Sequence, residues 1–181
     1  LDLKSFNTDN IIKMESMFDS CYSLTSLDLL QFNTKNVNNM KYMFNNCRDL
    51  TSIDLSNFDT TNVLYMENMF SATEKLKAID LSKFDTSNVK TMRNMFAYTG
   101  LTSLDLSSFN TGVVNDMCGM FMNALKLKTL RLTNFDFSNV ITISSMFSKC
   151  ELLTSIEFNK FNTVLAEEMF EIFNECKSLT S

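Results

Sequence analysis

The chain has 181 residues, a formal net charge of −5 and an isoelectric point near 4.8, and 45% of its residues are hydrophobic. This hydrophobic content is ordinary for a folded protein and argues against intrinsic disorder. The acidic balance argues against a nucleic-acid-binding protein, which needs a basic stripe. No apolar run in the sequence approaches the roughly 18 residues needed to span a bilayer.

A repeat of 26 residues organises the whole sequence. Its clearest sign is two columns of phenylalanine, whose members are separated by 26 residues except for one step of 25. The columns are Phe6, Phe32, Phe58, Phe84, Phe109, Phe135 and Phe161, and Phe18, Phe44, Phe70, Phe96, Phe121, Phe147 and Phe173. Two columns of mostly methionine run in phase with them, which favours core packing over an adaptable binding surface. A fixed period of this length is typical of repeat architectures.

The first half of each repeat has the pattern of a short strand. Leu27-Asp28-Leu29 alternates apolar and polar residues, which is the period-2 signal of a strand with one buried face. Asn33, Thr34 and Asn36 then offer side chains that can cap free amides at a helix start. The sequence does not show which of the three would be the cap.

The second half has apolar residues three and four positions apart. Val37, Met40, Met43, Phe44 and Cys47 would share one stripe of a helix of two to three turns. Such a short unit is stable only when neighbouring units stack. We therefore predict an α/β fold: a right-handed leucine-rich-repeat solenoid with about seven short parallel strands on one face and short helices on the other. Residues 1–181 form a single array, and because both ends fall within the pattern, we interpret it as an excerpt of a longer one.

The most suggestive surface feature is the outward position of each predicted strand. It is occupied by Asp2, Asp28, Asp54, Asp80, Asp105, Arg131 and Glu157. Strands in such a sheet lie about 4.8 Å apart, so like charges would stack directly and something should offset their repulsion. One reading is a divalent cation or a basic partner along the concave face. The other is screening by flanking Ser and Thr donors, backbone amides and water.

Catalytic signals are lacking in the sequence. It contains no histidine, which removes the commonest general base and metal ligand, and no Gly-rich phosphate loop or serine elbow. Four of the five cysteines share one column with Thr73, Thr99 and Ala124; they are Cys21, Cys47, Cys150 and Cys176. A disulfide or thiolate metal site is conceivable there, but the replacements favour a slot for any small residue. Cys118 lies off this column and is the candidate reactive thiol.

The consensus of the repeats is Leu-x-x-Leu-Asp-Leu-Ser-x-Phe-Asp-Thr-Ser-Asn-Val-x-x-Met-x-x-Met-Phe-x-x-Cys. It resembles the BspA-like leucine-rich-repeat surface proteins, in particular the 25-residue repeats of mycoplasma lipoproteins and related bacterial surface proteins. The last repeats drift from it, with Arg131 for Asp, Phe137 for Thr and Leu165 for Asn. Phe137, like Phe170, replaces a residue that is polar or small in most repeats, so each is either an exposed partner anchor or a packing residue.

The resemblance implies an extracellular, cell-surface array, with the parent protein anchored to a membrane or wall and used for adhesion. We expect a non-enzymatic module without cofactor or bound metal that contacts a host or neighbouring protein or a glycan. The candidate partner-binding residues are Asp28, Asp54, Asp80, Asp105, Arg131 and Glu157. The alternative is a structural spacer or display scaffold, which calcium on the aspartate column could stiffen.

Overall fold

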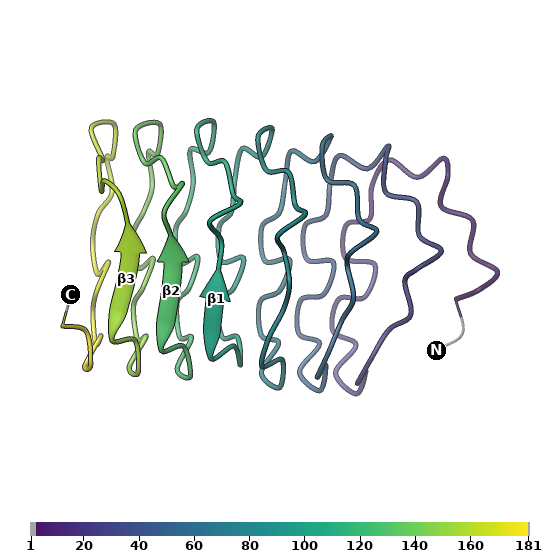
Figure 1. The fold of residues 1–181 in the computed structure, drawn as a ribbon, viewed down its shortest axis with the longest axis horizontal. Helices are drawn as coiled ribbons and strands as arrows, with labels where there is room; N and C mark the ends of the chain where they lie inside the picture. The colour runs from purple at the N-terminus through teal and green to yellow at the C-terminus, as the bar shows by residue number, and fades with distance from the viewer. Residues whose placement is uncertain (1–2, 181) are drawn as a thin grey trace.

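The computed structural model of the chain describes residues 3–180 and shows an elongated stack of coils, one for each sequence repeat (Figure 1). Neighbouring coils lie in parallel register. Isolated bridges connect Lys13 with Asn39, Asn39 with Tyr65, and so on along the chain to Glu168. We call the side that carries these bridges the turn side, and the side that carries the predicted strands the strand side.

The strand side forms a regular sheet only at its C-terminal end. Strands β1 (Ser103–Asp105), β2 (Thr129–Leu132) and β3 (Ser155–Phe158) pair in parallel in the order β1-β2-β3. The register places Asp105 opposite Arg131, and Arg131 opposite Glu157. Figure 1 shows these strands side by side, whereas the corresponding segments of the N-terminal coils spread apart. The prediction of about seven paired strands is therefore wrong within residues 3–180.

The predicted α/β leucine-rich-repeat solenoid with short helices is also wrong. Residues 3–180 contain no helix, so none in this range could cross a membrane. In place of each predicted helix, the chain makes a series of overlapping turns. The N–H of Met17 donates to the Met14 carbonyl at 3.3 Å, and the N–H of Phe18 donates to Met43 of the next coil at 3.0 Å. Backbone donors thus alternate between the same coil and its neighbour, so the i to i−4 ladder of a helix cannot form.

Left-handed backbone conformations make these turns possible. Two positions in every repeat have φ between 54° and 61°. They are Ser16, Tyr42, Asn68, Asn94, Gly119, Ser145 and Glu171 in one column, and Ser20, Asn46, Ala72, Tyr98, Asn123, Lys149 and Glu175 in the other. Each non-glycine residue in this region costs roughly 1–2 kcal/mol. The hydrogen bonds within and between coils, which repeat along the stack, offset this cost.

The apolar columns form one continuous core, as the repeat predicts. The phenylalanine rings of adjacent coils stack almost in parallel along the turn side, with centroids 5.6 Å apart for Phe44 and Phe70 and 5.7 Å apart for Phe70 and Phe96. Most methionines beside them are buried too, and Met40 and Met66 are fully covered, whereas Met169 of the last coil is exposed. The interpretation of the methionine columns as core is confirmed.

A second, polar column supports the core from inside. Thr60 is almost completely buried. Its hydroxyl accepts the N–H of Asp85 at 2.8 Å and donates to the carbonyl of the same residue at 2.8 Å. Thr34 makes the same two bonds to Asp59. One threonine therefore satisfies both backbone groups of a residue in the next coil, which buried backbone requires. Phe137 replaces the threonine of this column in its coil. It is fully buried, and its ring centroid lies 4.8 Å from that of Phe161, so Phe137 is a packing residue and not an exposed anchor.

The shortened repeat is accommodated at Gly100. A Cβ atom at this position would lie 2.1 Å from the carbonyl oxygen of Glu74, so only glycine fits without a shift of the backbone. The Gly100 N–H donates to the Thr73 carbonyl at 3.0 Å, which keeps the coils in contact across the deletion. The glycine thus absorbs the missing residue of the shortened repeat.

Candidate binding surface on the strand side

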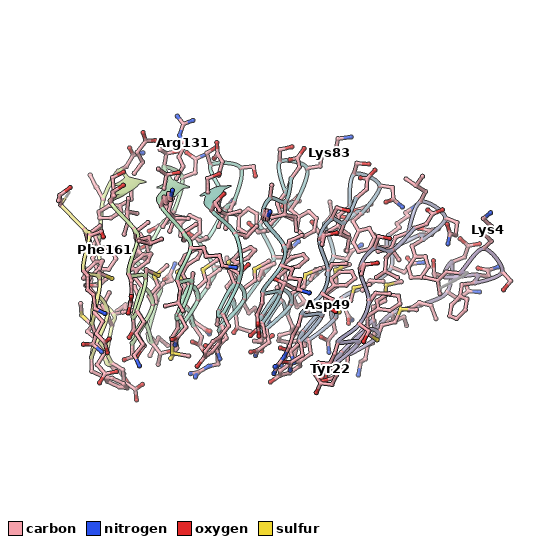
Figure 2. All side chains as sticks on the ribbon, turned by 90° about the horizontal axis from the view of Figure 1, so that it is seen from below. Lys4, Tyr22, Asp49, Lys83, Arg131 and Phe161 are labelled. Carbon is pink, nitrogen blue, oxygen red and sulfur yellow. The ribbon has the colours of Figure 1, made fainter. Side chains whose placement is uncertain are left out.

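The outward positions of the strand side form one exposed column of charge. All six candidate residues are exposed: Asp28, Asp54, Asp80, Asp105, Arg131 and Glu157. Asp2 lies outside the described residues. Figure 2 shows Arg131 and, farther along the stack, Lys83 at one edge of the molecule, and Tyr22 at the opposite edge. The column is therefore open to a partner along the stack.

A local turn fixes each aspartate of the column. The Oδ1 atom of Asp54 accepts the N–H of Ser56 at 2.9 Å, and Asp80 and Asp105 accept in the same way from Ser82 and Ser107. Asp28 makes a longer bond, of 3.2 Å, to the N–H of Leu30. The aspartate side chains thus serve their own turns.

These hydrogen bonds favour the charged form of the carboxylates. The N–H and the hydroxyl of Ser56 lower the pKa of Asp54, and those of Ser82 lower the pKa of Asp80. The hydroxyl and N–H of Ser107 lower the pKa of Asp105, with a smaller contribution from Arg131. Exposed carboxylates that hold their charge can accept hydrogen bonds and pair with cations. They are poorly suited to general acid catalysis, which needs a raised pKa.

Arg131 neutralises the C-terminal part of the column. Its Nε atom lies 2.9 Å from a carboxylate oxygen of Glu157, and one of its terminal nitrogens lies 3.7 Å from Asp105. A hollow of about 310 Å³ opens beside these pairs. Its lining includes the hydroxyl residues Ser103, Thr129 and Ser155 from the three strands. The structure thus brings three of the six candidate residues together.

The N-terminal part of the column, from Asp28 to Asp80, contains no arginine. Asp54 and Asp80 border a smaller hollow, of about 60 Å³, together with Lys83. The charge of Asp80 raises the pKa of Asp54 and that of Lys83 lowers it, but both effects are weaker than the hydrogen bonds from Ser56. Asp54 and Asp80 are therefore like-charged neighbours, and Lys83 beside them lowers the pKa of both carboxylates.

The geometry of this column does not support a binding site for a divalent cation. No group of three or more acidic, cysteine or histidine side chains within residues 3–180 is arranged to hold a metal ion. Calcium takes six to eight oxygen ligands, most of them from the protein in a dedicated site. The carboxylates of the column are instead spread one to a coil, each in its own turn.

The cysteines occupy packing positions. Cys47 and Cys150 are fully buried and free, and their thiols donate to backbone carbonyls of the preceding coil, Phe18 and Phe121. Burial raises the pKa of each thiol to about 12. This is the small-residue slot that the replacements by Thr and Ala indicate. Cys118 is only half exposed and burial also raises its pKa, so the prediction of a reactive thiol finds no support.

A groove of asparagines on another side of the coils was missed in the sequence. It has a volume of about 540 Å³ and includes Asn36, Asn62 and Asn88. Each of these amides donates to a backbone carbonyl of the preceding coil, at 2.9, 2.8 and 2.8 Å. The asparagine of the repeat consensus is the signal for this groove. Because these side-chain amides already donate to backbone carbonyls, the asparagines join neighbouring coils.

Comparison with known proteins identifies a family but no function. The model of one family, described as "Mycoplasma protein of unknown function, DUF285", matches residues 1–101 and 99–181. Comparison with curated proteins gave no match, and comparison with solved structures gave none either. The two matched segments together span all the coils described above. The chain therefore belongs to the DUF285 family of mycoplasma proteins of unknown function.

Proposed function

We propose that the chain is a non-enzymatic interaction module of the cell surface that binds a protein or glycan through the charged column of the strand side. The observation that supports this most is the exposure of the column from Asp28 to Glu157, with aspartates oriented by their own turns. Preorganised polar groups lower the cost of binding because little side-chain freedom is lost. The surface location rests on the resemblance of the repeat to BspA-like surface proteins.

The hollow beside Arg131 supports the same proposal. It combines a guanidinium, two carboxylates and three hydroxyl residues around the small apolar surface of Leu104 and Leu130. Such a mixture of donors and acceptors over an apolar floor suits the polar groups of a peptide or a sugar.

Charge reversal with a matched control tests the proposal. Asp28, Asp54 and Asp80 are changed together to lysine, and the variant is probed on a glycan array and on an array of lysine- and arginine-containing peptides. The control changes Asp59, Asp85 and Asp136 to lysine; these carboxylates also accept an N–H two residues later, but at a different position on the coils. We expect loss of binding only in the strand-side variant. Equal loss in both variants, or unchanged binding in the first, contradicts the proposal.

A structural spacer is the second candidate, and the continuous core favours it. Ring stacking along the turn side runs without interruption from Phe18 to Phe173. A stack of this kind can separate or display other regions of a protein without a ligand of its own. Absence of any ligand on both arrays, with binding located in other parts of the parent protein, would favour this role.

A further inference from the structure

The stack is notched at one edge, where one coil is a residue shorter than its neighbours. This coil spans residues 77–101, and we call it the short coil. The edge carries the turn that follows the cysteine column, at which Figure 2 labels Tyr22. In a coil of full length, the N–H of Asp49 donates across this turn to the Tyr22 carbonyl at 3.1 Å. The short coil has Gly100 alone in place of the two turn residues.

The missing residue leaves one backbone acceptor to a side chain. The Glu74 carbonyl, which occupies the position of the Tyr22 carbonyl in its coil, receives no backbone N–H from residues 3–180. The Nζ atom of Lys126 donates to it instead at 3.3 Å. These two residues are 52 positions apart, twice the length of the repeat, so the lysine side chain reaches past the short coil. The two flanking coils therefore frame a gap at this edge.

A pocket of about 180 Å³ occupies the gap, and we call it the edge pocket. It is lined by Glu74, Tyr98, Thr99, Asn123, Leu125 and Lys126. Sites for drug-sized ligands have volumes of roughly 300–1,000 Å³. The edge pocket is smaller, so it suits a single small ring.

Two residues of the edge pocket depart from the repeat in the same direction. Tyr98 lies in a left-handed column that otherwise carries Ser, Asn, Ala, Lys and Glu, and it is 46% exposed. Leu125 takes a position that other coils fill with Tyr, Arg, Glu or Lys, and it is 48% exposed. Exposed apolar surface thus appears where the chain is shortened. Local departures from an otherwise consistent pattern are expected at functional sites.

Polar groups around this apolar surface are available to a ligand. The side chains of Asn123 and Tyr98 make no hydrogen bond to the rest of residues 3–180. The amide of Asn123 offers both a donor and an acceptor, and the Tyr98 hydroxyl can act as either. Glu74 and Lys126 contribute one charge of each sign, so the lining has no net charge. The pocket therefore combines an aromatic face with polar groups and favours a neutral ligand.

We propose that the edge pocket binds one neutral pyranose unit of a glycan. The apolar face of the sugar ring packs on Tyr98 and Leu125, because an aromatic side chain presents a flat apolar surface. The sugar hydroxyls bond to Asn123, Glu74 and Lys126, which fix the orientation of the ring. An aliphatic side chain of a partner protein would cover the apolar surface but leave these polar groups unused. The pocket contains no residue of the charged column on the strand side, so the site is separate from the one proposed above.

A nuclear magnetic resonance titration of the isotope-labelled 181-residue chain tests this proposal. The probes are the methyl glycosides of the common neutral hexoses and N-acetylhexosamines, with N-acetyl-leucinamide as the probe for a protein side chain. We expect at least one glycoside to shift the amide resonances of Tyr98, Asn123 and Leu125 with a millimolar Kd, as is usual for so small a ligand. Tyr98→Ala should weaken this binding about tenfold. Tyr42→Ala, which changes another exposed tyrosine at a left-handed position, should leave the Kd unchanged.

A second variant fills the edge pocket. Replacing Gly100 with the dipeptide Glu-Lys gives the short coil the same turn as Thr73-Glu74-Lys75-Leu76 and restores the full repeat length. We expect this variant to lose the glycoside-induced shifts while its midpoint temperature of thermal unfolding is maintained. Glycoside binding should persist when Asp28, Asp54 and Asp80 are changed to lysine, which separates this site from the strand side.

Three outcomes would overturn the proposal. One is the absence of saturable shifts with every glycoside up to about 100 mM, where even weak binding is populated. Another is binding of N-acetyl-leucinamide, without any glycoside, at the same amides, which would assign the pocket to a side chain of a partner protein. The third is glycoside binding that survives in the filled variant or weakens equally in Tyr42→Ala.

Discussion

The two ends of the strand side carry the same alternation of residues but only one of them forms a sheet. Strand pairing joins Asp105 to Arg131 and Arg131 to Glu157, where neighbouring charges are opposite. Among the described residues, the segments around Asp28, Asp54 and Asp80, where neighbouring charges are alike, form no strand. Like charges directly opposite each other destabilise pairing and unlike charges support it. A single arginine in the column thus coincides with the change from separated segments to a sheet.

On the turn side, oppositely charged side chains also pair between neighbouring coils. Lys41 pairs with Glu67 at 2.7 Å, and this hydrogen bond raises the pKa of Lys41. Arg93 pairs with Asp116 at 2.8 Å. Charges on this side therefore face unlike neighbours, and its backbone ladder is continuous from Lys13 to Glu168. The turn side holds the stack together, and the strand side adds to it only where its charges allow.

The largest effect should come from the shared core and should not distinguish the two ends. Phe44→Ala and Phe121→Ala each remove a fully buried ring that stacks between two others at 5.6–5.8 Å. We expect each to lower the free energy of unfolding by about 3–5 kcal/mol, measured by chemical denaturation. The two losses in the free energy of unfolding should agree within about 2 kcal/mol, the usual variation among such sites. A larger difference would show that packing on the turn side is not uniform.

The next effect should appear at Arg131. Arg131→Asp turns two attractive pairs into repulsive ones, and we expect a loss of about 1–2 kcal/mol in the free energy of unfolding. The amide of Leu106, which donates to the Arg131 carbonyl at 2.9 Å, should exchange faster. Arg131→Gln is the control, because it removes attraction without adding repulsion and should have a smaller effect. Unchanged exchange in Arg131→Asp would disprove the role of charge in forming this sheet.

The reverse change at the other end should create pairing. Asp54→Arg places a cation between Asp28 and Asp80, and we expect slower exchange of the Ile53 and Leu55 amides. The net change in stability should stay within about 0.5 kcal/mol, since the bond from Ser56 is lost as the ion pairs form. Asp54→Asn keeps the acceptor and removes only the charge, so its effect on exchange should be intermediate. If the Ile53 and Leu55 amides exchange equally fast in the unaltered chain, Asp54→Arg and Asp54→Asn, charge repulsion is not what separates these segments.

The sequence predicted the columns of this fold better than its local conformation. The buried phenylalanines and methionines and the parallel register follow from the period alone. The helix prediction failed because apolar spacings of three and four suit overlapping turns as well as a helix. The distinguishing signal was at the left-handed positions, where Asn68, Asn94 and Gly119 share a column and tolerate positive φ.

The remaining features depend on partners 25 or 26 residues away. The bonds of Thr60 to Asp85 cannot be seen in a local window, although the threonine column is visible in the sequence. The acidic column was identified, and so was the repulsion that stacking would cause. Screening by flanking serine donors and backbone amides was one of the two readings of the sequence, and serine N–H groups do bond to three aspartates of the column. In the structure, turn hydrogen bonds hold each aspartate, and the segments stay apart.

The smallest effect should be a dependence of stability on acidic pH. The pKa values of Asp54, Asp80 and Asp105 are lower in the folded chain than the ordinary value, because serine N–H and hydroxyl groups bond to the carboxylates. Such groups contribute stability that is fully present above the unfolded pKa, near 4, and is lost as the pH falls through the folded pKa. The midpoint temperature of thermal unfolding should therefore decrease when the pH is lowered below about 4. This decrease should be smaller in the Asp54→Asn, Asp80→Asn double variant. A midpoint that rises on acidification would mean that relief of repulsion along the column outweighs the loss of these hydrogen bonds.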